Sequence, residues 1–118
     1  AAAPSATTNY YLNSGAVQYY TSSAANNWTL NVRGNSTTTL NSIMAVGQSL
    51  SITTLTTQGS TAYYNSAVQI DGTSVTPKYQ GGTAWASGNA SSIDAYVYTI
   101  VKTGSATFTV FASQTKFA

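Results

Sequence analysis

The sequence predicts an all-β domain, a jelly-roll-like antiparallel β-sandwich of about eight strands. Three observations lead to this prediction. Short runs rich in Thr, Val, Ile and Tyr recur along the 118 residues, and strands favour these residue types. Gly, Asn and Ser separate the runs at roughly the eight- to twelve-residue spacing of sandwiches and barrels. Apolar and polar residues alternate inside several runs, as expected for strands with one buried face.

The first two strand runs occupy residues 7–13 and 16–21 and flank Ser14-Gly15. Gly15 can adopt a positive φ without steric cost, so the pattern predicts a hairpin at this point. Residues 27–34 alternate regularly between apolar and polar side chains, which predicts a half-buried strand.

Helical spacing competes with strand spacing in one segment, where Leu40, Ile43 and Met44 fall at positions i, i+3 and i+4. We therefore allow one short helix near 38–47. Residues 49–58 return to a strand pattern, but strict alternation stops at Leu55, which indicates a bulge or an edge position.

Asp71 and Gly72 separate the strand runs 61–71 and 73–79. Asp-Gly is a preferred pair for a type I′ hairpin turn because both central residues need a positive φ. The sequence therefore assigns Asp71 to a turn and not to catalysis.

A final hairpin is predicted from residues 93–103 and 106–117, which flank Gly104. Both faces of the first run are largely apolar, and this pattern is typical of a central strand. The predicted core of the domain comprises Trp28, Leu30, Val32, Ile52, Val68, Ile70, Val97, Val110 and either Tyr96 or Phe108.

The surface is expected to be polar but uncharged. Thr, Ser, Asn and Gln account for 51 residues, whereas charged residues make up only 5% of the chain, against about a quarter in ordinary soluble domains. Because net charge contributes little to keeping such a chain dispersed, we expect it to be tethered to a large assembly. Residues 1–8 are interpreted as an N-terminal linker and residues 9–118 as a single domain.

Several kinds of chemistry are not expected. The chain has no Cys and no His, so thiolate sites and the commonest metal ligand and general base are missing, and we predict no metal, no cofactor and no enzymatic activity. Its two carboxylates are Asp71 and Asp94. The four cationic residues are scattered singly, which argues against nucleic-acid binding. No apolar run approaches the roughly 18–20 residues of a membrane span, so membrane insertion is not expected.

Aromatic residues are the more informative feature. Three tyrosine doublets begin at Tyr10, Tyr19 and Tyr63, and in a strand each doublet points one ring inward and one outward. Outward rings suit sugars or a neighbouring subunit, although they also cover sheets through cross-strand pairs, and we weigh these alternatives equally. Trp28 fits the core, whereas Trp85 lies in a Gly/Ala/Ser-rich loop and is expected to be exposed. The candidate binding residues are Trp85, Tyr11, Tyr20, Tyr64 and Tyr79.

Much of the chain carries a family resemblance. The segments ATTNYYLNSGAVQYYT, NWTLNVRG, TQGSTAYYNSAVQIDGTSVTPKYQGGT and SSIDAYVYTIVKTGSATFTVFASQTKFA resemble a domain at the C-terminal end of virion structural proteins of marine phages, especially cyanophages. The closing TFTVFASQTKFA is the most specific part of the match. The resemblance implies a tail-fibre, baseplate or capsid-appendage component on the exterior of the phage particle, and it carries over no catalytic residues.

The expected partners are therefore other virion proteins or copies of the same chain, with a host-surface glycan as a further candidate. Two alternatives stay open at this point. One is a capsid decoration protein, and the other is a secreted bacterial surface or carbohydrate-binding β-sandwich module.

Overall fold

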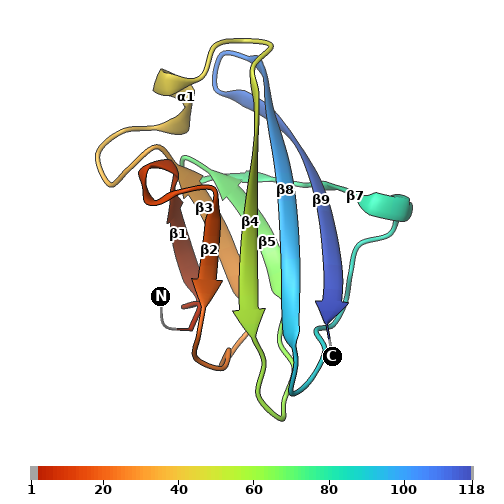
Figure 1. The fold of residues 1–118 in the computed structure, drawn as a ribbon. Coiled ribbons are helices and arrows are strands. Elements are labelled where there is room, and N and C mark those ends of the chain that lie inside the picture. Colours follow the sequence, from red (N-terminus) through yellow and green to blue (C-terminus); the bar gives the residue numbers. More distant parts are fainter. Residues whose placement is uncertain (1–2, 118) are drawn as a thin grey trace.

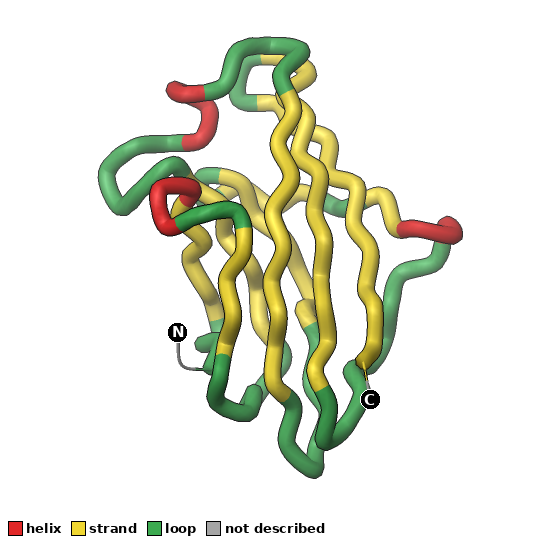
Figure 2. The backbone as a smooth tube through the Cα atoms, in the orientation of Figure 1, coloured by secondary structure: helices red, strands yellow, loops and turns green. Residues whose placement is uncertain are grey.

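The computed structural model describes residues 3–117, which form two β-sheets packed face to face (Figures 1 and 2). Over these residues the chain has nine strands and a single one-turn α-helix. The predicted all-β sandwich is therefore confirmed, with the apolar residues of both sheets meeting between the layers.

The four-stranded sheet has the order β1-β3-β5-β6. Its strands are β1 (Thr7–Tyr11), β3 (Trp28–Arg33), β5 (Asn65–Ile70) and β6 (Thr73–Val75). The first three run parallel to one another, and β6 pairs with β5 in the opposite direction.

The five-stranded sheet has the order β2-β4-β8-β9-β7. Its strands are β2 (Val17–Tyr20), β4 (Ser49–Thr57), β7 (Lys78–Tyr79), β8 (Ile93–Gly104) and β9 (Thr107–Phe117). The long strands β4, β8 and β9 are antiparallel, while β2 and β7 run parallel to their neighbours at the two edges.

The chain crosses between the sheets after each of its first four strands, so strands β1 to β5 alternate between the two layers. Neighbouring strands among β1 to β5 consequently run in the same direction, so the predicted antiparallel pairing is confirmed for β4, β8 and β9 and for β5 with β6, and is wrong for the remaining pairs. The predicted hairpin at Ser14-Gly15 is also wrong, because β1 and β2 belong to different sheets. A 3₁₀ turn at Leu12–Ser14 and Gly15, with φ of 111°, carry the chain across the sandwich instead.

The other two predicted hairpins are confirmed. Asp71 and Gly72 have φ values of 52° and 81°, as a type I′ turn requires, and Ile70 pairs with Thr73 across them. The hairpin β8–β9 closes the chain, and β8 lies between β4 and β9 as a central strand.

Several elements differ in detail from the prediction. Residues 73–79 were predicted as one strand, but they divide between β6 in one sheet and β7 in the other. Strand β1 begins at Thr7, inside the range assigned to the linker, because the Thr29 amide donates to the Ala6 carbonyl at 2.9 Å and Thr8 is buried. Strand β4 has no bulge and is not at an edge, since its register with β8 is continuous. Alternation does not stop at Leu55: threonines replace aliphatic residues at the inward positions 54 and 56.

The core contains most of the predicted residues. Trp28, Leu30, Val32, Ile52, Val68, Ile70, Tyr96 and Val110 are all buried. Val97 is not, because its side chain points away from the other sheet and is 37% exposed, and Phe108 is only partly buried. Tyr10, Leu40, Tyr98 and Ile100 are also fully buried.

The short helix α1 (Leu40–Ile43) confirms the predicted helical turn. Leu40 and Met44 face the core, whereas Ile43 is exposed. The Asp71 carboxylate accepts the amide of Leu40 at 2.6 Å and that of Asn41 at 2.9 Å. At the other end, the buried Lys102 ammonium donates to the carbonyls of Asn41 and Met44, each at 2.8 Å. The charges at both ends therefore complement the helix dipole.

Candidate functional site

The outward face of the five-stranded sheet is uncharged over four of its strands. We call it the outer sheet face and define it by the outward positions of β2, β4, β8 and β9. Cross-strand register places these positions in rows, such as Val17, Thr53, Val97 and Ser113. Every outward position of these strands carries an aliphatic, aromatic or hydroxyl side chain.

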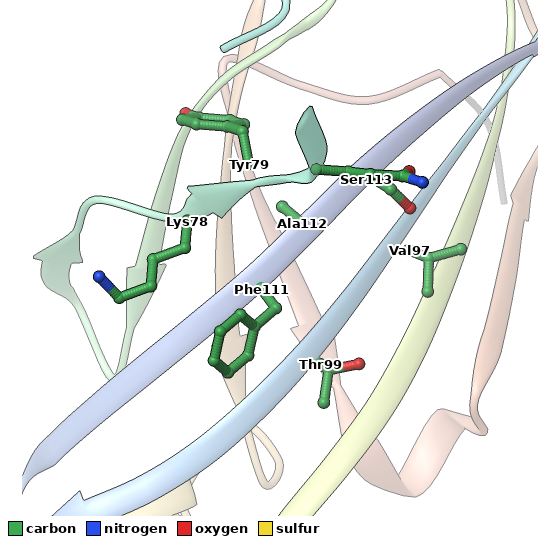
Figure 3. A pocket seen from close by; sticks show the side chains of 8 residues that line it. Lys78, Tyr79, Val97, Thr99, Phe111, Ala112 and Ser113 are labelled. Carbon is green, nitrogen blue, oxygen red and sulfur yellow. The ribbon is translucent and has the colours of Figure 1, made fainter. Parts of the chain in front are cut away.

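A groove of about 520 Å³ lies on this face where β7 pairs with β9, and residues of β8 also line it (Figure 3). Lys78, Tyr79 and Gln80 line it from the side of β7. The floor and far wall come from four outward residues of the long strands and one small residue, namely Val97, Thr99, Phe111, Ser113 and Ala112. We call this the β7 groove.

Phe111 is the most prominent ring in the β7 groove. It is 49% exposed, and its backbone partner in β7 is Lys78, so the two side chains leave the same face of the sheet. Figure 3 shows the phenyl ring between the side chains of Lys78 and Thr99. The arrangement combines one accessible aromatic face with polar groups on both sides.

Two of the predicted binding residues come together beside this groove. The rings of Tyr79 and Trp85 meet edge to face at 4.9 Å between centroids. Trp85 is not the exposed loop ring that the sequence predicted, because it also contacts Tyr96 at 5.1 Å and its indole N–H donates to the Asn65 carbonyl at 2.6 Å. Trp85 is therefore half-buried and fastens the loop to the core.

The other predicted binding residues are dispersed. Tyr20 is 5% exposed and belongs to the interior, where burial, with a smaller contribution from Tyr10, raises its pKa to about 12. The prediction of a binding role for Tyr20 is wrong because the inward member of that doublet is Tyr20 and the outward member is Tyr19. Tyr11 lies half-buried at the end of β1 in the other sheet, and Tyr64 packs against the core before β5.

Sequence reasoning missed Phe111, Thr99 and Ser113, and it placed Val97 in the core. A signal was present, because both faces of residues 93–103 are apolar. In a two-layer sandwich only one face of a central strand can meet the other sheet. The second apolar face therefore marked an exposed surface, and β9 continues it.

The two carboxylates do not form a catalytic pair. The Asp71 carboxylate accepts a hydrogen bond from the Asn41 backbone amide, and the Asn41 carbonyl accepts one from the Lys102 ammonium, so Asp71 lies near Lys102. Lys102 is eight residues along β8 from Asp94. Eight residues of strand extend roughly 26 Å, whereas paired glycosidase carboxyls lie about 5–10 Å apart.

Asp94 is fully buried beneath the loop that precedes β8. Its Oδ2 atom accepts the Gln58 side-chain amide at 2.9 Å and the Asn89 backbone amide at 3.0 Å. Its Oδ1 atom has no hydrogen-bond partner within residues 3–117. The carboxylate therefore holds the loop in place and is shielded from solvent.

In the described part of the chain no three His, Cys, Asp or Glu side chains group into a metal site. No helix in that part is long and apolar enough to cross a membrane. Comparisons with protein-family models, with curated proteins and with solved structures found no match.

Proposed function

We propose that this chain is a non-catalytic structural domain on the exterior of a phage virion, of the tail-fibre, baseplate or appendage type, and that it contacts other virion proteins through its outer sheet face. The observation that carries the proposal is the absence of charge from the outward positions of β2, β4, β8 and β9, combined with exposed apolar side chains such as Val17 at 58% and Phe111 at 49%. Such a face can be desolvated by a partner at little electrostatic cost.

The outward face of the four-stranded sheet provides a contrast. It carries mainly amide and hydroxyl side chains, among them Asn9 and Asn31, whose side chains are hydrogen-bonded to each other at 3.0 Å. Polar groups that already bind one another or water gain little from a partner surface. The contrast between the two faces therefore favours the outer sheet face as the contact surface.

The edges of the five-stranded sheet are less suited to contact. Both edge strands are short, since β7 has two residues and β2 has four. Beside β7, the Gln114 side chain of β9 donates to the Ser87 carbonyl at 2.9 Å, which holds the loop before β8 against β9. Short or covered edges resist strand addition. The sheet is therefore expected to meet its partners face to face.

The proposal is tested with virions that carry Val17→Lys, which places a charge on the outer sheet face at β2, far across the sheet from the β7 groove. We expect the isolated domain to melt at an unchanged temperature, because Val17 is exposed, and the amount of the chain in purified particles to fall severely. Quantitative mass spectrometry of purified virions measures this amount.

The matched control is Ala67→Lys, at an exposed position on the outward face of β5. It adds the same charge to the other sheet and should leave incorporation unchanged. Equal incorporation of the Val17→Lys chain, or absence of the wild-type chain from purified particles, would contradict the proposal.

A further inference from the structure

We infer that the β7 groove is a binding site for a saccharide that carries acidic groups, such as carboxylates or sulfates. This inference deepens the proposed function, because it rests on the outer sheet face being a contact surface and names the class of ligand that one part of it takes.

The shape of the groove fits a sugar better than a peptide. Its volume of about 520 Å³ is within the range of small-molecule sites. Strand β7 forms the sheet edge beside the groove, but it has only two residues, which pair with Phe111 and Ala112 of β9, so it is too short for an extended peptide to add to it. Half-exposed Phe111 instead offers a flat ring, and the C–H groups on one side of a pyranose can pack against such a ring.

Unpaired polar groups surround the ring. Within residues 3–117 the side chains of Lys78, Gln80 and Ser113 have no hydrogen-bond partner, although all three line the groove. The Thr99 hydroxyl is bonded to that of Ser51 at 3.0 Å and keeps further bonding capacity. These four polar side chains can hydrogen-bond to the hydroxyl groups of a sugar while the Phe111 ring packs against the face of the sugar ring.

The charge of the groove favours a saccharide with acidic groups over a neutral one. Among the described residues that line the groove, Lys78 is the only one with a charged side chain. Of the two carboxylates in the chain, Asp71 binds the amides of α1 and Asp94 is buried beneath its loop. Within residues 3–117 no acidic side chain therefore lines the groove to repel a carboxylate or sulfate, and the exposed Lys78 ammonium attracts one.

The experiment measures binding of a tetrameric uronic acid oligosaccharide and of a neutral glucose tetramer by NMR titration of the full chain. We expect both to bind, the acidic one about two- to fivefold more tightly, as one exposed ion pair provides. Phe111→Ala should weaken both by about tenfold through loss of the ring contact. Lys78→Gln should remove only the preference for the acidic ligand.

Two substitutions near the end of β9 are matched controls, one for Phe111→Ala and one for Lys78→Gln. Phe117→Ala removes an exposed ring outside the groove, and Lys116→Gln removes an equal charge outside it. Both should leave binding unchanged. The inference is overturned if neither saccharide binds the wild-type chain, if Phe111→Ala binds as well as wild type, or if the controls weaken binding equally.

The two proposals fail independently. A wild-type chain that enters virions but binds no saccharide would refute the groove assignment alone. A chain that binds the acidic tetramer through Phe111 but is missing from virions would refute the structural role alone. If Phe111→Ala lowers incorporation into particles while the wild-type chain binds no saccharide, the groove accommodates a protein and the inference is wrong.

Discussion

At the scale of single residues, Asp71 both forms a turn and caps a helix. Its φ of 52° fits the type I′ turn, while its carboxylate accepts two backbone amides at the start of α1. The turn could be predicted from the Asp-Gly pair alone. The capping role could not, since it joins residues 30 and 31 positions apart in the sequence.

Asp71→Asn separates these two roles, because Asn also tolerates the left-handed conformation of the turn. We expect the free energy of unfolding in urea to fall by about 1–2 kcal/mol through loss of the charge-assisted bonds. Hydrogen exchange at the amides of Leu40 and Asn41 should accelerate. Unchanged exchange at both amides would show that the carboxylate does not hold α1.

Gly88 is required because there is no room for a side chain at this position, and not because its backbone adopts a positive φ. A Cβ atom at this position would collide with the Tyr63 carbonyl oxygen and would lie 2.6 Å from the Gln58 amide nitrogen and 2.8 Å from Asp94 Oδ2. The backbone of the loop before β8 therefore lies so close to the Asp94 carboxylate that only glycine fits at position 88.

Gly88→Ala is expected to lower the free energy of unfolding by about 2–3 kcal/mol, the scale of an overpacked interior. Gly104→Ala is the matched control, because the nearest atoms to its Cβ are at 3.6 and 3.7 Å, an ordinary contact distance. It should change stability by less than about 0.5 kcal/mol. Equal effects in thermal melts of the two variants would refute the close packing over Asp94.

At the scale of elements, strand β8 shows what the sequence could and could not predict. Alternation identified the strand, and apolar residues on both faces identified its central position. Neither pattern shows which face meets the other sheet. Val97 was assigned to the core, but Tyr96, Tyr98 and Ile100 are the residues that face inward.

Paired truncations on β8 test this assignment. Ile100→Ala should destabilise the domain by about 2–5 kcal/mol because it leaves a cavity, whereas Val97→Ala should cost less than about 1 kcal/mol. Urea unfolding measures both values. A larger loss for Val97→Ala than for Ile100→Ala would mean that β8 presents the opposite face to the core.

The strand connections show the limit of local signals. The hairpins at Asp71-Gly72 and Gly104 were predictable because adjacent strands pair across a short turn. The crossing from β1 to β2 was not, because a Ser-Gly pair fits a tight hairpin and a sheet-to-sheet connection equally well. The groove depends on this long-range arrangement, since β7 reaches β9 only after the chain has crossed the sandwich.

At the scale of the whole molecule, the interior is unusually rich in tyrosine. Burial raises the pKa of Tyr96 to about 12, despite the opposing hydrogen bond from Gln114, and burial raises the pKa of Tyr98 well above its ordinary value. Trp28, Tyr96 and Tyr98 form ring contacts in the core, and the Tyr98 hydroxyl donates to the buried Asn65 side chain at 2.8 Å.

These shifts predict alkaline unfolding. The folded chain holds the tyrosine protons above pH 10, where unfolded tyrosines with a pKa of 10.0 release them, so stability is complete below pH 10 and falls as the pH rises toward 12. Tyr96 alone should account for about 2–3 kcal/mol of this loss. Urea unfolding across this range should show a shallower fall for Tyr96→Phe, and an identical fall would contradict the prediction.

The central claim is that the domain acts by contact through the outer sheet face. The most direct measurement is side-chain footprinting of the chain, free and within assembled particles, by covalent labelling and mass spectrometry. We predict that Val17, Tyr19, Val97 and Phe111 are labelled in the free chain and protected in the particle, while Tyr11 on the other sheet is labelled equally in both. Protection confined to the four-stranded sheet, or equal labelling of the outer sheet face in both states, would contradict the account.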